Sequence, residues 1–221
     1  MTRNVWLPER VKKVDQVGQN VLVRGCMPLA GDPWRFAYDE ISAAAGVPLG
    51  AYDLIDVSLI DCVGERYMLQ PEMHAFGLQA PGDQYWPPYE QKGYDPRVGN
   101  ETALRTEDGI VPATFYWWPI EGLPEGGDAR AFLGSPGWDL SGLVDLVWHL
   151  VSAPTARPKA VYVHCTLGAD RTGALHTSYL VRRGATLDDA IRAADSSTPA
   201  GAPSEDYRRL RAAYAASRTP G

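Results

Sequence analysis

The residues of this chain that could do chemistry together are concentrated in one run, His164-Cys165-Thr166-Leu167-Gly168-Ala169-Asp170-Arg171-Thr172-Gly173. A cysteine followed by five residues and an arginine, with a glycine between them, can fold into a tight loop around a tetrahedral dianion. Backbone N–H groups then point inward, and the start of the following helix adds partial positive charge. The arginine offers a planar fork for two phosphate oxygens. The same positive field favours thiolate over thiol, so the run predicts a nucleophile aimed at phosphorus.

The neighbouring sequence supports this interpretation. An apolar β-type stretch, Ala160 to Val163, comes before the run, and a helical pattern follows it. The alternative is a buried structural cysteine at the end of a core strand, with an arginine placed at a helix start for solubility. A cysteine and an arginine at this spacing arise by chance in many chains, but here spacing and context agree.

The run resembles the His-Cys-x5-Arg-Thr-Gly signature of the cysteine-based protein-tyrosine-phosphatase superfamily. It is most similar to the atypical, dual-specificity-like branch, which includes bacterial tyrosine and lipid phosphatases and myotubularin-like phosphoinositide phosphatases. The resemblance implies a metal-independent phosphatase that needs no cofactor and hydrolyses phosphomonoesters through a phosphocysteine intermediate. Cys165 would be the nucleophile, Arg171 would bind the phosphate and the transition state, Thr172 would ease departure of the thiolate, and His164 would tune it. By this resemblance, the phosphoryl oxygens would be bound by the backbone N–H groups of Thr166, Leu167, Gly168, Ala169, Asp170 and Arg171.

A second resemblance concerns the segment that begins Trp118-Pro119-Ile120-Glu121. It is similar to the mobile Trp-Pro-Asp loop of tyrosine phosphatases, whose aspartic acid protonates the leaving oxygen. A gapless comparison places Ile120 at that position, and an isoleucine cannot move a proton. Asp170 is the first candidate for the general acid, because an Asp directly before the Arg has this role in the resembled atypical enzymes. Glu121 is the second candidate, if the loop is shifted by one position.

The acidic residues near these two segments could instead have structural roles. Asp170 could brace the loop by accepting N–H bonds without taking part in chemistry. Asp128 and Asp139 are weaker candidates for the acid, and we expect Asp139 to cap a helix. An ester with a leaving group of low pKa would need no acid.

Composition limits the other function classes. The chain has 221 residues and a net charge of −6, which argues against nucleic acid as the main partner. No apolar stretch is long enough to span a membrane, and the N-terminus leads into a charged stretch. The three cysteines show no paired spacing, which argues against a zinc site or a disulfide framework and favours a cytoplasmic location.

The pattern of apolar residues predicts an α/β fold. Short strands are expected around 21–23, 54–60, 113–116 and 160–163, and helices around 34–45, 63–76, 139–151, 171–183, 186–194 and after Ser204. Strands alternating with helices imply a mostly parallel central sheet of about four or five strands flanked by helices. We expect one phosphatase-like domain over residues 1–221, with a long irregular insert rich in Pro, Gly and aromatic residues at about 78–111.

The expected substrate is a phosphorylated protein, carrying phosphotyrosine or also phosphoserine and phosphothreonine, or a phosphorylated lipid or small molecule. No glutamine follows Cys165 and no Lys-Asn-Arg-Tyr loop is present, which points away from a strict phosphotyrosine enzyme. The loop also lacks the lysines common in phosphoinositide phosphatases. Two alternatives remain: a phosphate-binding pseudophosphatase, and a thiol-dependent enzyme like an arsenate reductase. Against the second, Cys26 and Cys62 lie far from the run and are expected to be core residues.

A short segment near the N-terminus carries a further resemblance. Arg24-Gly25-Cys26-Met27-Pro28 is similar to an Arg-Ser-x-x-Pro element near the start of many atypical superfamily members.

Overall fold

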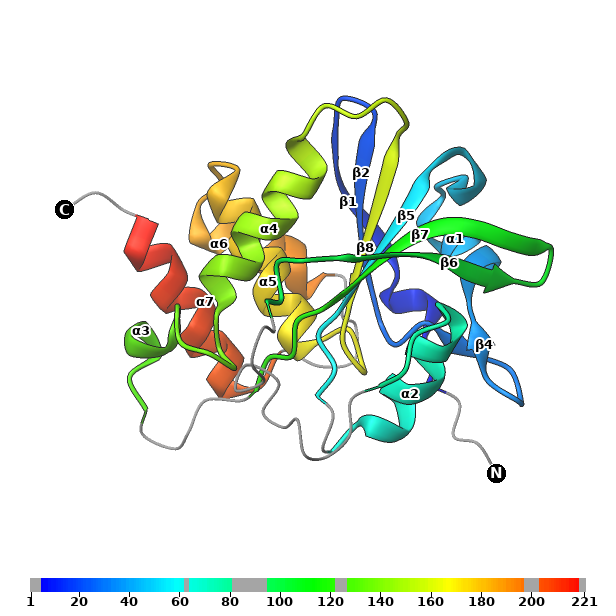
Figure 1. The fold of residues 1–221 in the computed structure, drawn as a ribbon. Coiled ribbons are helices and arrows are strands. Elements are labelled where there is room, and N and C mark those ends of the chain that lie inside the picture. Colours follow the sequence, from blue (N-terminus) through cyan, green and yellow to red (C-terminus); the bar gives the residue numbers. More distant parts are fainter. Residues whose placement is uncertain (1–4, 62–63, 81–94, 122–126, 197–202, 219–221) are drawn as a thin grey trace.

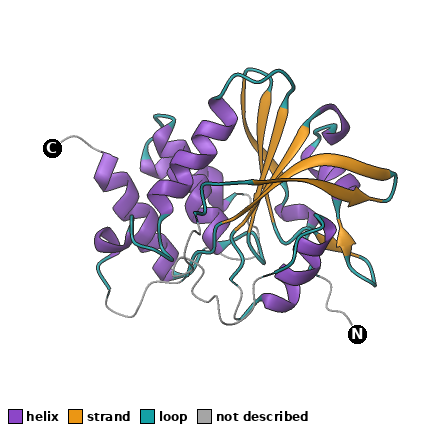
Figure 2. Cartoon of the chain, viewed as in Figure 1, coloured by secondary structure: helices purple, strands orange, loops and turns teal. Residues whose placement is uncertain are grey.

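The computed structural model describes residues 5–61, 64–80, 95–121, 127–196 and 203–218. Its centre is a six-stranded sheet in the order β1-β2-β8-β5-β7-β6 (Figures 1 and 2). The four inner strands run parallel to one another, and each edge strand is antiparallel to its neighbour. The strands are β1 (Lys12–Val17), β2 (Asn20–Gly25), β5 (Asp53–Ser58), β6 (Asn100–Thr106), β7 (Gly109–Trp117) and β8 (Lys159–His164).

The predicted α/β class with a mostly parallel sheet is confirmed, and the sheet is larger than the four or five strands expected. The difference lies at the edge strands. Residues of β1 and most residues of β6 are exposed or half-buried, so neither sequence shows the apolar run that identifies a buried strand. Strand β6 also lies within 78–111, where an irregular insert was expected; residues 81–94 of that segment fall outside the described residues.

Helices cover both faces of the sheet (Figure 1). One face packs against α1 (Tyr38–Ala45) and α2 (Arg66–Ala75), and the other against a group led by α4 (Leu140–Ser152) and α5 (Asp170–Arg182). Side chains of β8 alternate between the two cores as the period of a strand requires: Val161 and Val163 face the α4 and α5 side. The remaining elements are α3 (Ala129–Phe132), α6 (Leu187–Asp195), α7 (Glu205–Arg218), the short helices η1 (Pro8–Arg10) and η2 (Leu49–Ala51), and the two-stranded sheet of β3 (Leu29–Ala30) and β4 (Arg35–Phe36).

Local signals in the sequence account for several helix boundaries. The Asp139 side chain accepts from Gly142 N at 2.7 Å, so it caps α4 as expected. Thr186 caps α6 in the same way. The helix expected from residue 34 starts only at Tyr38, because residues 35–36 form β4. None of the helices in the described ranges has the length and apolar character needed to cross a membrane.

The sheet brings together segments that are distant in the sequence. Because β2, β5, β7 and β8 are parallel, their carboxyl ends meet at one edge. The residues that follow these ends are 26–28, 59–61, 118–121 and 165–169. In open α/β folds this edge is where ligands usually bind.

Gly25 shows how closely these segments pack. A Cβ added to this residue would overlap the hydroxyl of Tyr162, which is fully buried and donates to Cys26 O at 2.7 Å. We expect Gly25→Ala to lower the free energy of unfolding by about 1–3 kcal/mol, because the ring cannot move without losing that hydrogen bond. Urea unfolding measures it. Gly50→Ala is the matched control, since its Cβ would meet nothing within 4 Å; equal effects at both positions would contradict this account.

Candidate active site

The segment between β8 and α5, residues 165–169, forms a loop with unused backbone donors; we call it the cysteine loop. The N–H groups of Thr166, Leu167, Gly168 and Ala169 donate to none of the residues that the structure describes. Helix α5 starts directly after them, at Asp170. Backbone N–H groups without a protein acceptor at the start of a helix are the usual elements of an anion site.

Three contacts hold the carbonyl groups of residues 164, 166 and 168 away from that site. Leu59 N donates to His164 O at 3.0 Å, and Met27 N donates to Thr166 O at 3.1 Å. The guanidinium of Arg24 donates to Gly168 O. In a trans peptide the C=O and the following N–H point in opposite directions. Fixing the carbonyls of residues 164, 166 and 168 toward β2 and β5 therefore turns the N–H groups of Cys165, Leu167 and Ala169 to the opposite side.

Gly168 is required at its position. Its φ of 69° lies in the left-handed region, and a Cβ there would come within 2.7 Å of Gly25 O. The segment that follows β2 therefore packs directly against the cysteine loop. This contact places the short element at residues 24–28 beside the cysteine run.

Arg171 reaches back from the first turn of α5 to the segment that follows β5. Its Nη1 and Nη2 each donate to Glu65 at 2.6 Å, and Nη1 also donates to Leu59 O at 2.8 Å. The Nε edge of the guanidinium has no partner among the described residues, so it is free for an oxyanion. Burial alone would lower the pKa of Arg171, but the contact with Glu65 outweighs burial and raises it. Burial alone would raise the pKa of Glu65, but the contact with Arg171 outweighs burial and lowers it.

Glu65 was not predicted from the sequence. It precedes α2, and its carboxylate also accepts from the Thr166 hydroxyl. One acidic side chain thus fixes both the arginine and the first residue after the cysteine. Its only sequence signal is an acidic residue beside a helix start, which is common on protein surfaces.

Cys165 begins the cysteine loop, and Thr172 lies in the first turn of α5. The cysteine is 2% exposed and the Thr172 side chain is fully buried. The Thr172 hydroxyl has no hydrogen-bond partner among the described residues. An unpartnered buried hydroxyl is a costly feature, and it is consistent with a group that acts on a bound molecule.

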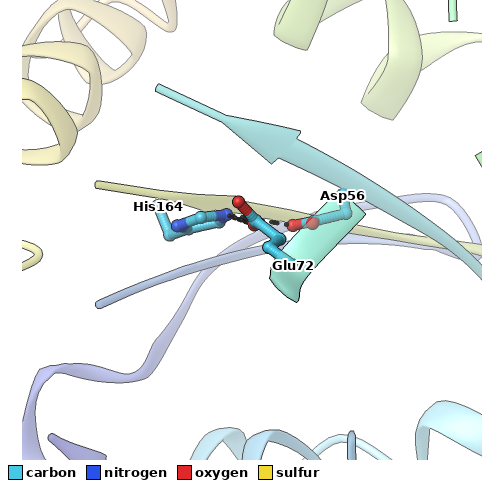
Figure 3. Close-up of side chains that lie close together, drawn as sticks. All are labelled: Asp56, Glu72 and His164. Atoms are coloured by element: carbon cyan, nitrogen blue, oxygen red, sulfur yellow. Dashed lines mark ion pairs between the residues drawn. The ribbon is translucent and has the colours of Figure 1, made fainter. Parts of the chain in front are cut away.

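His164 points away from the cysteine, into the core beneath α2. Its Nε2 lies 2.6 Å from Glu72 Oε1 and 3.4 Å from Asp56 Oδ1, and all three side chains are fully buried (Figure 3). Burial alone would lower the pKa of His164, but Glu72 and Asp56 outweigh it and raise it to about 10. Burial raises the pKa of Asp56 to about 7, against the opposing effect of His164. His164 is therefore an imidazolium held between two acidic groups at neutral pH.

The same three residues are the group in the described part of the chain that could offer metal ligands. The 2.6 Å separation of Nε2 and Oε1 is a hydrogen-bond distance, and Ser58 Oγ also donates to Glu72 at 2.9 Å. These contacts give the cluster a role as a charge network in the core. Its one signal in the sequence is the aspartate inside the apolar strand β5, and that residue alone does not indicate its partners.

The two candidates for the general acid have different surroundings. Glu121 follows β7, with its N–H donating to Gly137 O at 2.8 Å. Partial burial and the nearby Asp61 raise its pKa. Asp170 instead accepts from Ser204 N at 2.6 Å and so braces the segment that leads into α7. Residues 122–126 of the Trp-Pro segment lie outside the described residues.

Cys26 does not have the properties of a reactive thiol. It is fully buried, and burial raises its pKa to about 12. Its sulfur accepts from Leu7 N at 3.1 Å. These contacts fit the core role expected for Cys26, whereas Cys62 lies outside the described residues.

No family model and no curated protein matches this chain. Solved structures that resemble it include the Trypanosoma brucei protein tyrosine phosphatase TbPTP1, with 17% identity and a TM-score of 0.47 over 91% of this chain and 70% of that one. A variant of human DUSP28 has 18% identity and a TM-score of 0.42 over 93% and 95% of the two chains. PTPMT1 in complex with PI(5)P has 12% identity and a TM-score of 0.42 over 92% and 94%.

The buried charge network predicts a pH dependence of stability. A raised histidine pKa contributes stability below pH 6.5 that is lost as the pH rises through about 10. We therefore expect the free energy of unfolding to fall by roughly 1 kcal/mol or more between pH 6.5 and 10. In Glu72→Gln the fall should be smaller and should occur at lower pH. Urea unfolding across this range measures both, with His74→Gln, an exposed histidine on α2, as the control; indistinguishable profiles for all three proteins would contradict the prediction.

Proposed function

We propose that this protein is a cysteine-dependent phosphatase that hydrolyses phosphomonoesters. The observation that carries the proposal is the row of four unused N–H groups in the cysteine loop, between a buried cysteine and an arginine with a free Nε edge. A tetrahedral dianion satisfies all of these donors at once. Such preorganised donors stabilise charge that develops in the transition state.

The proposed reaction has two steps. In the first, the Cys165 thiolate attacks phosphorus, a P–S bond forms and the P–O ester bond breaks. The leaving oxygen takes a proton from an acid, while Arg171 and the loop N–H groups hold the three equatorial oxygens. In the second, a water oxygen attacks phosphorus, the sulfur leaves as thiolate, and the water proton returns to the acid. The Thr172 hydroxyl stabilises the departing sulfur, and no step requires a metal ion.

Of the two acids, the surroundings favour Glu121. A general acid must hold its proton in the resting complex, and partial burial beside Asp61 raises the pKa of Glu121. Asp170 is already used as the acceptor for Ser204 N. Asp170 keeps a bracing role in this proposal, and the pH profiles of variants at the two positions separate the assignments.

The substrate is a phosphorylated protein, lipid or small molecule. Leu167, the one large apolar residue of the cysteine loop, is 54% exposed. It adds an apolar surface beside the unused donors and no positive charge. This favours a monophosphorylated group on an apolar or aromatic carrier over a highly phosphorylated inositol.

The first experiment tests the nucleophile. We expect wild-type protein to hydrolyse 4-nitrophenyl phosphate in the presence of EDTA, and Cys165→Ser to lose at least a thousandfold in kcat because a hydroxyl is not ionised at this position. Acid quenching during turnover should trap a phosphorylated Cys165 peptide, detected by mass spectrometry. Residual turnover of Cys165→Ser near the wild-type rate would reject the mechanism. Binding of phosphate without turnover in the wild type would identify a pseudophosphatase.

The second experiment tests the acid. A carboxyl with a raised pKa donates only below that pKa, so kcat for alkyl phosphates should fall as the pH rises through it. We expect Glu121→Gln to lower kcat for alkyl esters by about a hundredfold and to remove this basic limb. Esters with an acidic leaving group should be affected much less. If Asp170→Asn removes the limb and Glu121→Gln keeps it, the assignment reverses.

A further inference from the structure

A buried arginine of strand β2 lies directly against the cysteine loop. Arg24, in β2, is 2% exposed. One terminal nitrogen donates to Gly168 O, and the other donates to Ala194 O at 3.1 Å and lies 3.0 Å from His176 Nδ1. The arginine therefore links the loop to α5 and α6.

None of these contacts neutralises the charge of Arg24. No carboxylate of the described residues forms an ion pair with it, although a buried charge is normally paired. Burial and the neighbouring Arg24 lower the pKa of His176 to about 3, so this imidazole is a neutral acceptor. Asp195 on α6 is already paired with Arg211 at 2.9 Å. Burial lowers the pKa of Arg24 to about 10, which still leaves it protonated at neutral pH.

Two further titratable groups that face Arg24, Arg10 and Tyr162, supply no negative charge. Arg10, from η1, carries the same charge and adds to the positive field. Burial keeps the pKa of Tyr162 well above its ordinary value, so the phenol is neutral. Negative charge on Cys165 opposes the lowering of the Arg24 pKa most strongly, and Asp195, which is already paired with Arg211, opposes it less.

The groups that surround the Cys165 sulfur also single out Arg24. The titratable groups facing it are Arg24, Arg171, Cys26, Tyr162 and Tyr207. Burial raises the pKa of Cys26 and of both tyrosines, so these three are neutral. Arg171 is neutralised by the bidentate contact with Glu65. Among the described residues that face the sulfur, Arg24 is thus the positive charge that has no direct carboxylate partner.

We propose that Arg24 is the buried counter-ion of the Cys165 thiolate and the residue that fixes the Gly168 peptide in its anion-binding orientation. It acts as a positioning residue and does not contact the substrate. Its charge favours the ionised sulfur, and its hydrogen bond to Gly168 O turns the N–H of Ala169 toward the oxyanion. This inference deepens the proposed function and rests on it, since a thiolate is needed here only if the sulfur is the nucleophile.

The experiment measures ionisation of the sulfur without relying on turnover. The rate at which iodoacetamide alkylates Cys165, followed by mass spectrometry of the peptide, is recorded from pH 4 to 9. For Arg24→Gln we expect the midpoint of this profile to rise by about one pH unit and the rate at pH 6 to fall about tenfold. Arg182→Gln, which removes an arginine of α5 that is paired with Asp145 of α4, should keep the wild-type midpoint.

A purely structural role for Arg24 would lower thermal stability and leave the midpoint unchanged. A folded Arg24→Gln protein with the wild-type midpoint therefore overturns the inference. If that variant does not fold, Arg24→Lys decides. A lysine keeps the charge but cannot contact Gly168 O, Ala194 O and His176 together, so we expect a smaller rise of the midpoint and at least a threefold loss of vanadate affinity. Wild-type values for both quantities in Arg24→Lys would contradict the inference.

Failure of this inference and failure of the proposed function give different results. A wild-type protein with an ionised Cys165 and the predicted Arg24→Gln shift, but without turnover of any phosphoester, would keep the counter-ion and reject the phosphatase. Turnover that depends on Cys165, with no shift in Arg24→Gln, would keep the phosphatase and reject the counter-ion.

Discussion

The structure depends on an electrostatic requirement at the carboxyl edge of the sheet. Four backbone N–H groups without a described acceptor and the start of α5 belong to the segment that follows Cys165, and the guanidinium groups of Arg24 and Arg171 both contact that segment. Like charges that are buried together repel each other, and buried donors without an acceptor lose the hydration that they had in water. An anion placed beside this segment would accept from these donors and offset the positive charge.

The rest of the fold maintains this arrangement through contacts from the neighbouring strands. Arg24 in β2 and Met27 after β2 hold two carbonyls of the loop, and Leu59 after β5 holds the carbonyl of His164 at the end of β8. Glu65 orients Arg171 and leaves its Nε edge free. His164 is the last residue of β8, and its imidazolium is fixed by the buried Asp56 and Glu72. These contacts anchor the end of the strand on the face of the sheet that packs against α2. Together, the contacts from the neighbouring strands orient the loop without a bound ligand, as the proposed electrostatic catalysis would require.

The sequence was sufficient for the parts of the site that are local. The cysteine, the glycine and the arginine lie within one strand-loop-helix unit, and the apolar patterns of 139–151 and 160–163 predict α4 and β8, the two elements that precede the loop. The α/β class followed from the alternation of strands and helices. The edge strands β1 and β6 were missed or assigned to a loop because their side chains are largely exposed.

The long-range partners could not be predicted in this way. Glu65 and Asp56 come to the site only because β5 lies next to β8 in the sheet, and no local pattern in the sequence encodes that order. Arg24 was visible as part of a short motif, but its lack of a carboxylate partner is a property of the folded chain. The choice between Asp170 and Glu121 likewise depends on which of them is already engaged, as Asp170 is by Ser204.

The most direct test of the central claim is a titration of ¹⁵N-labelled protein with tungstate, a tetrahedral dianion, followed through its backbone amide signals. The account predicts that the signals of residues 166–169 shift together and saturate with a single dissociation constant, and that Arg171→Ala weakens that binding at least tenfold. Saturable binding that leaves these four signals unchanged would contradict it, because the unused N–H groups would then not be the anion site.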